Sequence, residues 1–99
     1  MLIILGTIST APSQVKDLLT DLRAGIARTL KEDGCLFYEF SMLDEATGTI
    51  LAAERWRDQD SLTAHLSTPE IAELLGKWGD KISLNVSKFD ASNQRGMGD

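Results

Sequence analysis

The chain has 99 residues, of which 42% are hydrophobic, and it carries a formal net charge of −5. This length supports one domain with a single core, so a roomy pocket would need help from a partner chain. The negative charge opposes binding to nucleic acid and to anionic membrane surfaces, because both repel it. We therefore expect neither of these partners.

The cysteine content and the first residues bear on the cellular compartment. Cys35 is the only cysteine, so no internal disulfide can form. Residues 1–5 are apolar, but this run is too short for a signal peptide and has no basic residue before it. No stretch approaches the roughly 20 apolar residues of a membrane-spanning helix. We expect a cytoplasmic protein.

The sequence lacks the chemistry-bearing motifs of several common enzyme classes. With one histidine and one cysteine, the chain has no recognisable zinc, calcium or iron site. It also lacks the glycine-rich dinucleotide and phosphate-binding motifs and the serine nucleophile elbow. We expect no metal and no cofactor, so any catalysis must use few protein groups.

The first third of the chain predicts a strand followed by a helix. Residues 2–9 are rich in aliphatic and β-branched side chains, which is typical of a strand buried on both faces. Residues 13–32 are predicted to form one helix, which Gly34 ends in a left-handed cap. The buried face of this helix is predicted from the spacing of Val15, Leu18, Leu19, Leu22, Ile26 and Leu30.

The middle of the chain predicts an antiparallel hairpin. Residues 35–43 alternate in character, which predicts a strand with two distinct faces. A polar turn then leads into a third strand over residues 49–57, in which Glu54 and Trp56 share a face.

The last third predicts a broken helical region and a fourth strand. Asp58 can cap a short helix, and Thr68-Pro69 can start its continuation, so the helix is expected to break near residues 67–69. Residues 81–89 alternate as a fourth strand. Residues 91–99 have no apolar periodicity, and we expect a flexible C-terminal tail.

The element order is βαββαβ, which predicts an α+β domain over residues 1–90 with a ferredoxin-like fold and an antiparallel four-stranded sheet. Right-handed crossovers place both helical regions on one face of this sheet. We expect the opposite face to carry Trp56 and either Phe37 or Tyr38, which would leave a large apolar patch in water. A second sheet is the simplest cover, so we predict a homodimer.

Short segments at characteristic spacings carry a family resemblance: Gly34-Cys35-Leu36-Phe37-Tyr38, Glu54-Arg55-Trp56, Ser61-Leu62, His65-Leu66 and Ser67-Thr68-Pro69. In this pattern the chain resembles the antibiotic biosynthesis monooxygenase family over about residues 2–90. The resemblance implies a dimeric α+β barrel in which two sheets pack face to face, with a ligand cavity between each sheet and its own helices. Members include quinol monooxygenases, cofactor-free polyketide oxygenases and haem-degrading enzymes.

The chain departs from two branches of that family. Haem-degrading members have an asparagine on the first strand and an iron-binding histidine near the end of the second helix, where this chain has Gly6-Thr7 and Leu74-Leu75. Haem cleavage is therefore not expected. Polyketide oxygenases have an asparagine four residues before the third-strand tryptophan, where this chain has Ala52, so their substrate hydrogen bonds do not carry over.

His65 is the candidate catalytic residue. It lies between Leu62 and Leu66 at helical spacing, which turns it toward the sheet, and an imidazole suits proton transfer near neutral pH. The alternative is a core histidine that bonds to the backbone. The candidate substrate-binding residues are Trp56, Tyr38, Phe37, Leu62 and Glu54.

We expect His65 and Trp56 to line one cavity in each subunit. Packing alone is the alternative role for Trp56 and Tyr38. Glu54 is expected to form a structural ion pair, because an unpaired buried carboxylate is costly.

The predicted function is a cofactor-independent monooxygenase that acts on a small phenolic or quinol substrate. Without a metal or flavin, the electrons that reduce dioxygen must come from the substrate itself. Two alternatives remain open: a non-catalytic dimer that binds a small aromatic or quinone-like ligand, and a purely structural dimerisation module.

Overall fold

The computed structural model describes all 99 residues, with four strands and four helices. In chain order the elements are β1 (Leu2–Ser9), α1 (Val15–Ala24), α2 (Ile26–Thr29), β2 (Cys35–Asp44), β3 (Thr49–Trp56), α3 (Gln59–Leu66), α4 (Pro69–Trp78) and β4 (Ser83–Asp90). All four predicted strands are present, and β1 has the predicted bounds.

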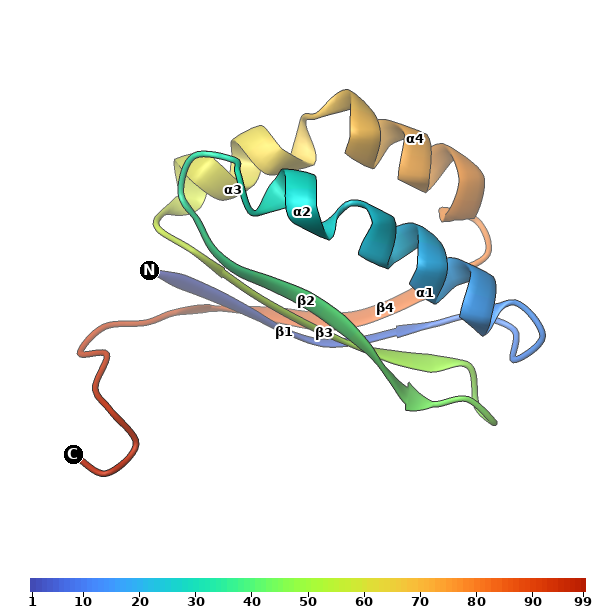
Figure 1. Cartoon of the computed structure of the whole chain (residues 1–99), viewed down its shortest axis with the longest axis horizontal. Helices are drawn as coiled ribbons and strands as arrows, with labels where there is room; N and C mark the ends of the chain where they lie inside the picture. The colour runs from blue at the N-terminus through green and yellow to red at the C-terminus, as the bar shows by residue number, and fades with distance from the viewer.

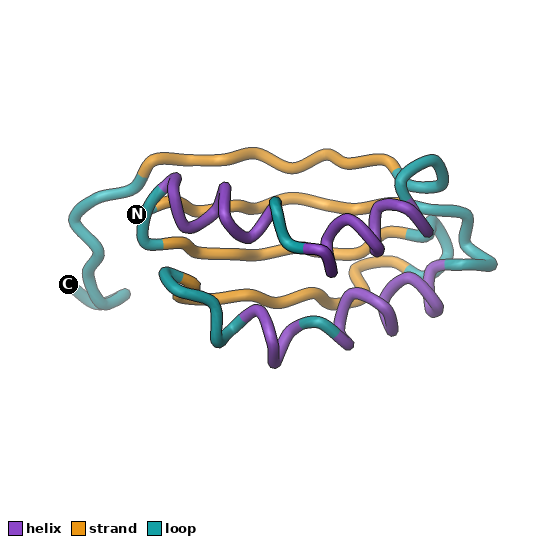
Figure 2. The backbone as a smooth tube through the Cα atoms, turned by 90° about the horizontal axis from the view of Figure 1, so that it is seen from above, coloured by secondary structure: helices purple, strands orange, loops and turns teal.

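The strands form one antiparallel sheet in the order β2-β3-β1-β4. The helices cover one face of this sheet and leave the other face open (Figure 1). They lie in two rows across it, α1 with α2 and α3 with α4 (Figure 2). The predicted α+β fold of ferredoxin-like βαββαβ layout is therefore confirmed.

The first helical region differs from the prediction of one helix over residues 13–32. It begins at Val15, ends at Thr29 and is interrupted at Gly25, whose amide bonds to the Leu22 carbonyl three residues back. Beyond the interruption, the buried position of α2 is occupied by Thr29 and not by the predicted Leu30. Leu30, predicted on the buried face, is consequently half exposed.

The second helical region breaks where the sequence predicts. Asp58 caps α3, and hydrogen bonds from the Ser61 hydroxyl and amide lower the pKa of the Asp58 carboxyl to about 2. Thr68 caps α4 by accepting from the Ile71 amide, with Pro69 at the first helical position. The longest helices, α1 and α4, have ten residues each, and none is long and apolar enough to cross a membrane.

Gly34 occupies a position that only glycine fills without strain. Its φ is +83°, and a Cβ atom there would collide with the Ser61 side chain. The close approach brings the residue before β2 against α3.

The two faces of the sheet have different contents. The core lies between the sheet and the helices and contains Leu2, Ile8, Val15, Leu18, Leu19, Leu22, Tyr38, Phe40, Ile50, Ala52, Trp56, Leu62 and Trp78. The prediction that Trp56 lies on the open face is wrong, because its face of β3 is the one that α3 covers, and Trp56 is fully buried.

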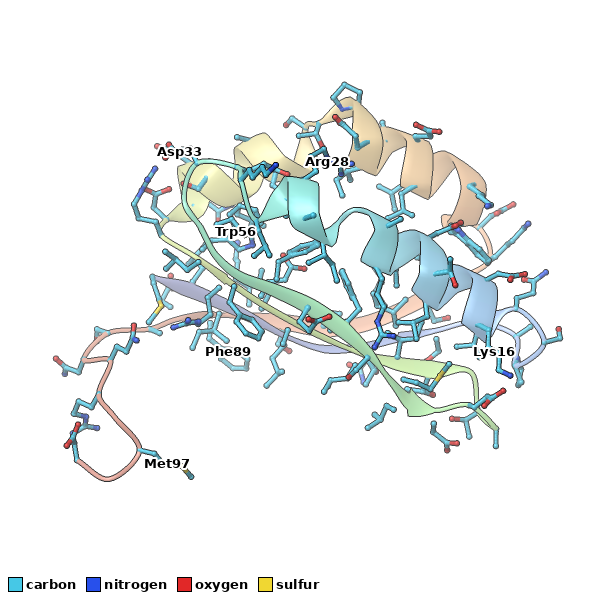
Figure 3. All side chains as sticks on the ribbon, viewed as in Figure 1. Lys16, Arg28, Asp33, Trp56, Phe89 and Met97 are labelled. Atoms are coloured by element: carbon cyan, nitrogen blue, oxygen red, sulfur yellow. The ribbon has the colours of Figure 1, made fainter.

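The open face carries an apolar row that runs across the sheet. Ile3 of β1 pairs in register with Phe89 of β4 and with Arg55 of β3, which in turn pairs with Phe37 of β2. Leu5, Phe37 and Phe89 are each about half exposed. Figure 3 shows Phe89 on the side of the sheet away from the helices and Trp56 on the helix side.

Candidate functional site

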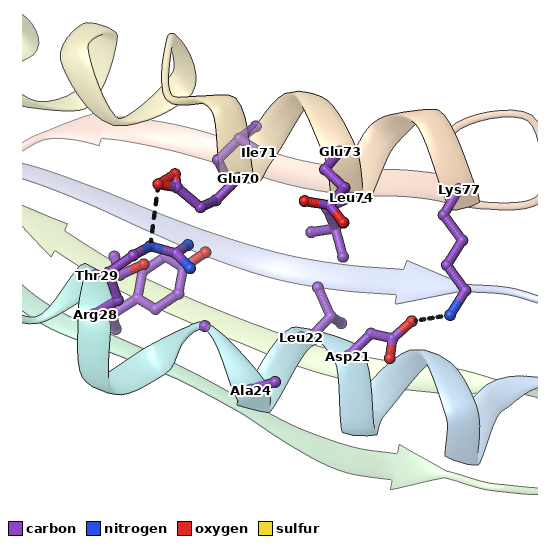
Figure 4. A pocket seen from close by; sticks show the side chains of 12 residues that line it. Asp21, Leu22, Ala24, Arg28, Thr29, Glu70, Ile71, Glu73, Leu74 and Lys77 are labelled. Carbon is purple, nitrogen blue, oxygen red and sulfur yellow. Dashed lines mark ion pairs between the residues drawn. The ribbon is translucent and has the colours of Figure 1, made fainter.

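A pocket of about 380 Å³ lies between α1 and α2 on one side and α4 on the other. An ion pair ties the two helical rows together at each end of it (Figure 4). At one end Arg28 Nε lies 3.9 Å from Glu70 Oε1, and at the other Lys77 Nζ lies 2.8 Å from Asp21 Oδ2. The volume falls in the range of sites that bind small molecules.

Tyr38 of β2 is the one sequence-predicted site residue that lines this pocket. Its side chain is buried, and its hydroxyl makes no hydrogen bond within the chain. Burial raises the pKa of the Tyr38 hydroxyl, and the carboxylates of Glu54 and Glu32 raise it further. The hydroxyl therefore stays protonated at neutral pH and can donate to a ligand oxygen.

Tyr38 connects the pocket to a buried aromatic cluster. Its ring makes edge contacts with His65 and Trp56, at centroid distances of 5.2 and 6.4 Å, and the His65 and Trp56 rings are 4.8 Å apart. The predicted proximity of His65 and Trp56 is therefore present in the fold, but neither lines the pocket above Tyr38. The His65 and Trp56 rings instead pack against the Tyr38 ring.

His65 is 2% exposed and faces the sheet, as its helical spacing predicts. The hydrogen bond of its Nδ1 goes to the Glu32 carboxylate at 3.0 Å, not to a backbone group. This contact joins α3 to the loop before β2 and fixes the orientation of the imidazole ring.

Glu54 lies next to this cluster, and its contact differs from the predicted ion pair. It makes no ion pair, and its partner is the Trp56 indole, which donates to Glu54 Oε1 at 2.9 Å. Burial raises the pKa of the Glu54 carboxyl, while the indole hydrogen bond and the electrostatic effect of the nearby His65 ring partly oppose the rise.

Replacing Glu54 with glutamine should raise the free energy of unfolding at pH 7. The folded state holds the Glu54 proton to a higher pH than the unfolded state does, so this residue costs stability as the pH rises above its ordinary pKa. Glutamine keeps an acceptor for Trp56 and carries no charge. Urea unfolding should therefore give a higher free energy of unfolding for the variant than for the wild type at pH 7, and equal values near pH 4. A variant that is less stable at both pH values would contradict this assignment.

Two other predicted residues do not reach the site. Phe37 lies on the open face, where Arg55 stacks over its ring at 5.7 Å, because neighbouring residues of a strand point to opposite faces and Tyr38 takes the inner one. Leu62 is buried in the core beneath α3 and does not line the pocket.

The sequence prediction missed the polar side chains that line the pocket from the helices. Thr29 Oγ1 and Glu70 Oε2 are buried and have no hydrogen-bond partner. A signal for Thr29 was present, since it continues the spacing of Leu22 and Ile26 and is therefore a polar residue on a buried helix face. Glu70 stands in the first turn of a helix, where acidic residues are common for capping reasons alone.

The described side chains contain no group of three or more His, Cys, Asp or Glu residues arranged to hold a metal ion. The polar groups at the pocket are instead hydrogen-bonding and charged side chains, together with apolar ones from Leu22, Ile71 and Leu74. Such a lining suits a small ring that bears polar substituents.

Comparison with known proteins agrees with this architecture. The family model of the antibiotic biosynthesis monooxygenases matches residues 1–76. A Deinococcus radiodurans structure whose name refers to the same family is 23% identical, with a TM-score of 0.85 and 98% of each chain covered. A Pseudomonas aeruginosa protein is 26% identical, with a TM-score of 0.76 over 95% of this chain and 94% of that one. None of the curated proteins matches the chain by sequence. The chain belongs to the antibiotic biosynthesis monooxygenase family.

Proposed function

We propose that the protein is a cytoplasmic, cofactor-independent monooxygenase that oxidises a small phenol or quinol in the pocket above Tyr38. The observation that carries this proposal is the Tyr38 hydroxyl, which is protonated, without a partner in the chain and at the floor of a pocket of about 380 Å³. Family membership supports the class of reaction.

The reaction that fits this pocket uses dioxygen as the oxidant and the substrate as the source of electrons. For 1,4-dihydroxynaphthalene, one oxygen atom forms a new bond to ring carbon, and the other leaves as water with two substrate hydrogens. The product is 2-hydroxy-1,4-naphthoquinone. The protein supplies a bounded pocket, a hydrogen-bond donor to the substrate oxygen and a fixed ring orientation.

The proposed roles of the predicted residues follow from their contacts. Tyr38 binds the substrate, and Trp56 and His65 hold the Tyr38 ring in place by packing against it. Glu32 fixes His65 through the contact to Nδ1. His65 does not line the pocket and makes no hydrogen bond to the Tyr38 hydroxyl, so we propose that it positions the Tyr38 ring and does not itself accept the substrate proton.

The proposal predicts that protein treated with a metal chelator consumes dioxygen when 1,4-dihydroxynaphthalene is added. Spontaneous oxidation of this quinol yields hydrogen peroxide, whereas the proposed reaction yields water, so added catalase should return no dioxygen from the enzymatic part. Tyr38→Phe should lower the rate on the order of tenfold or more, because a donor to the reacting oxygen is lost. Its melting temperature should stay unchanged, since the hydroxyl has no partner to lose.

A second candidate function is binding of a small aromatic ligand without turnover. The observation that favours it is the absence of His65 from the pocket lining, which leaves Tyr38 as the only predicted residue there. Saturable ligand binding with dioxygen consumption no faster than the spontaneous rate would select this alternative.

We also propose that two copies pair through the open sheet face to form a homodimer. The apolar side chains of Ile3, Leu5, Phe37 and Phe89 lie together on this face. Each copy also presents a cationic Arg55 and an anionic Glu39, which can pair between copies.

A further inference from the structure

We infer that Thr29 and Glu70 bind a hydroxyl group of the ligand and thereby make the pocket selective for hydroxylated rings. This inference rests on the proposed function for the position of the ligand, and it adds two specificity-determining residues that lie on α2 and α4. Neither residue is part of the aromatic cluster.

Both residues have polar atoms that the fold leaves without a partner. Thr29 is 1% exposed, and its Oγ1 bonds to nothing in the chain, although a helical threonine can bond to the carbonyl of the turn before it. Glu70 uses Oε1 for the contact with Arg28, while Oε2 is buried and unbonded. Buried polar atoms without a partner are rare, because each one loses the free energy of its hydration.

The two side chains come from different helices and lie at the same end of the pocket. Figure 4 shows Thr29 and Glu70 at the end where Arg28 bridges α2 and α4, whereas Asp21 and Lys77 close the other end. Tyr38 belongs to the same lining.

One chemical group satisfies these atoms together. A ligand hydroxyl donates its hydrogen to the Glu70 carboxylate and accepts the hydrogen of the Thr29 hydroxyl. A second ligand oxygen can then accept from Tyr38. A hydrogen bond to a carboxylate is stronger than one between neutral groups. A ligand that carries this hydroxyl should therefore bind more tightly than the same ring without it. An ether in the same place cannot donate and leaves Glu70 Oε2 unpaired.

The test compares binding of two ligands with the same ring under anaerobic conditions, by titration calorimetry. The probes are 1,4-dihydroxynaphthalene and its dimethyl ether. Wild-type protein should bind the diol more tightly than the ether. Thr29→Val and Glu70→Gln should each weaken diol binding about five- to tenfold and leave ether binding unchanged. Thr29→Ser keeps the hydroxyl and should bind the diol as the wild type does.

Two variants control for general effects of these substitutions. Thr20→Val removes an exposed helical hydroxyl whose bond is local, and Glu45→Gln removes a surface ion pair with Lys16. Neither residue lines the pocket, and both variants should bind the diol normally. Thr29→Val should also raise the melting temperature of the free protein, because it removes a buried hydroxyl that has no partner.

Three results would overturn the inference. These are normal diol binding by both Thr29→Val and Glu70→Gln, equal losses of diol and ether binding, or no diol binding by the wild type. The last result would also remove the proposed function. Diol binding that depends on Thr29 and Glu70 without dioxygen consumption would refute turnover alone and leave this inference standing.

Discussion

Replacing Trp56 with alanine is expected to lower the free energy of unfolding by about 3–5 kcal/mol. Trp56 is fully buried, its ring packs on His65 and Tyr38, and its indole is the hydrogen-bond partner of Glu54. The substitution leaves a cavity and removes the hydrogen-bond donor of the partly buried Glu54 carboxyl, and each of these changes is destabilising. The loss is a large part of the stability of a domain of this size.

Urea unfolding followed by circular dichroism measures this loss. Because Trp56→Ala can approach complete unfolding, Trp56→Phe serves as the milder variant and should fall between it and the wild type. Leu66→Ala on the exposed side of α3 is the matched control and should change stability little. A loss below about 1 kcal/mol for Trp56→Ala would mean that the cluster does not hold the fold together.

Placing a charge on the open sheet face is expected to convert the proposed dimer into a folded monomer. Leu5 lies in a central strand and is half exposed in the single chain, so Leu5→Glu can be tolerated there. Between two packed sheets the same carboxylate would be buried without a partner, which costs several kcal/mol at each of two symmetric positions.

Sedimentation velocity at micromolar concentration tests this, with a dimer expected for the wild type and a monomer for Leu5→Glu. Leu84→Glu introduces the same charge on β4 at an exposed position whose register partner, Ile8, faces the helices. This control should remain dimeric. A wild-type monomer, or a dimer that persists in Leu5→Glu, would show that the open face does not pair two copies.

Local signals in the sequence were sufficient to predict most of the fold. The caps at Asp58 and Thr68 are short-range hydrogen bonds between residues close in sequence, and the structure contains both. The left-handed Gly34 is likewise a local requirement. The break at Gly25 was missed because one glycine within an apolar helical pattern is compatible with either a continuous or an interrupted helix.

The candidate site could be predicted only in part, for reasons of packing. Alternation along β3 put Glu54 and Trp56 on one face, but which face the helices cover depends on the whole sheet, and Trp56 was therefore misplaced. The contact between His65 and Glu32 spans 33 residues and has no local signal. The placement of Thr29 and Glu70 in the lining of one pocket depends on how two helices lie over the sheet, which neither segment encodes alone.

Mass spectrometry of the product formed under ¹⁸O₂ tests the proposed oxygenase most directly. Chelator-treated protein would be given 1,4-dihydroxynaphthalene, and the product would be reduced at once so that its oxygens do not exchange with water. We expect 2-hydroxylated product that carries one ¹⁸O atom, with its formation lowered on the order of tenfold or more in Tyr38→Phe. Unlabelled naphthoquinone with hydrogen peroxide, formed at the same rate with and without the protein, would contradict it.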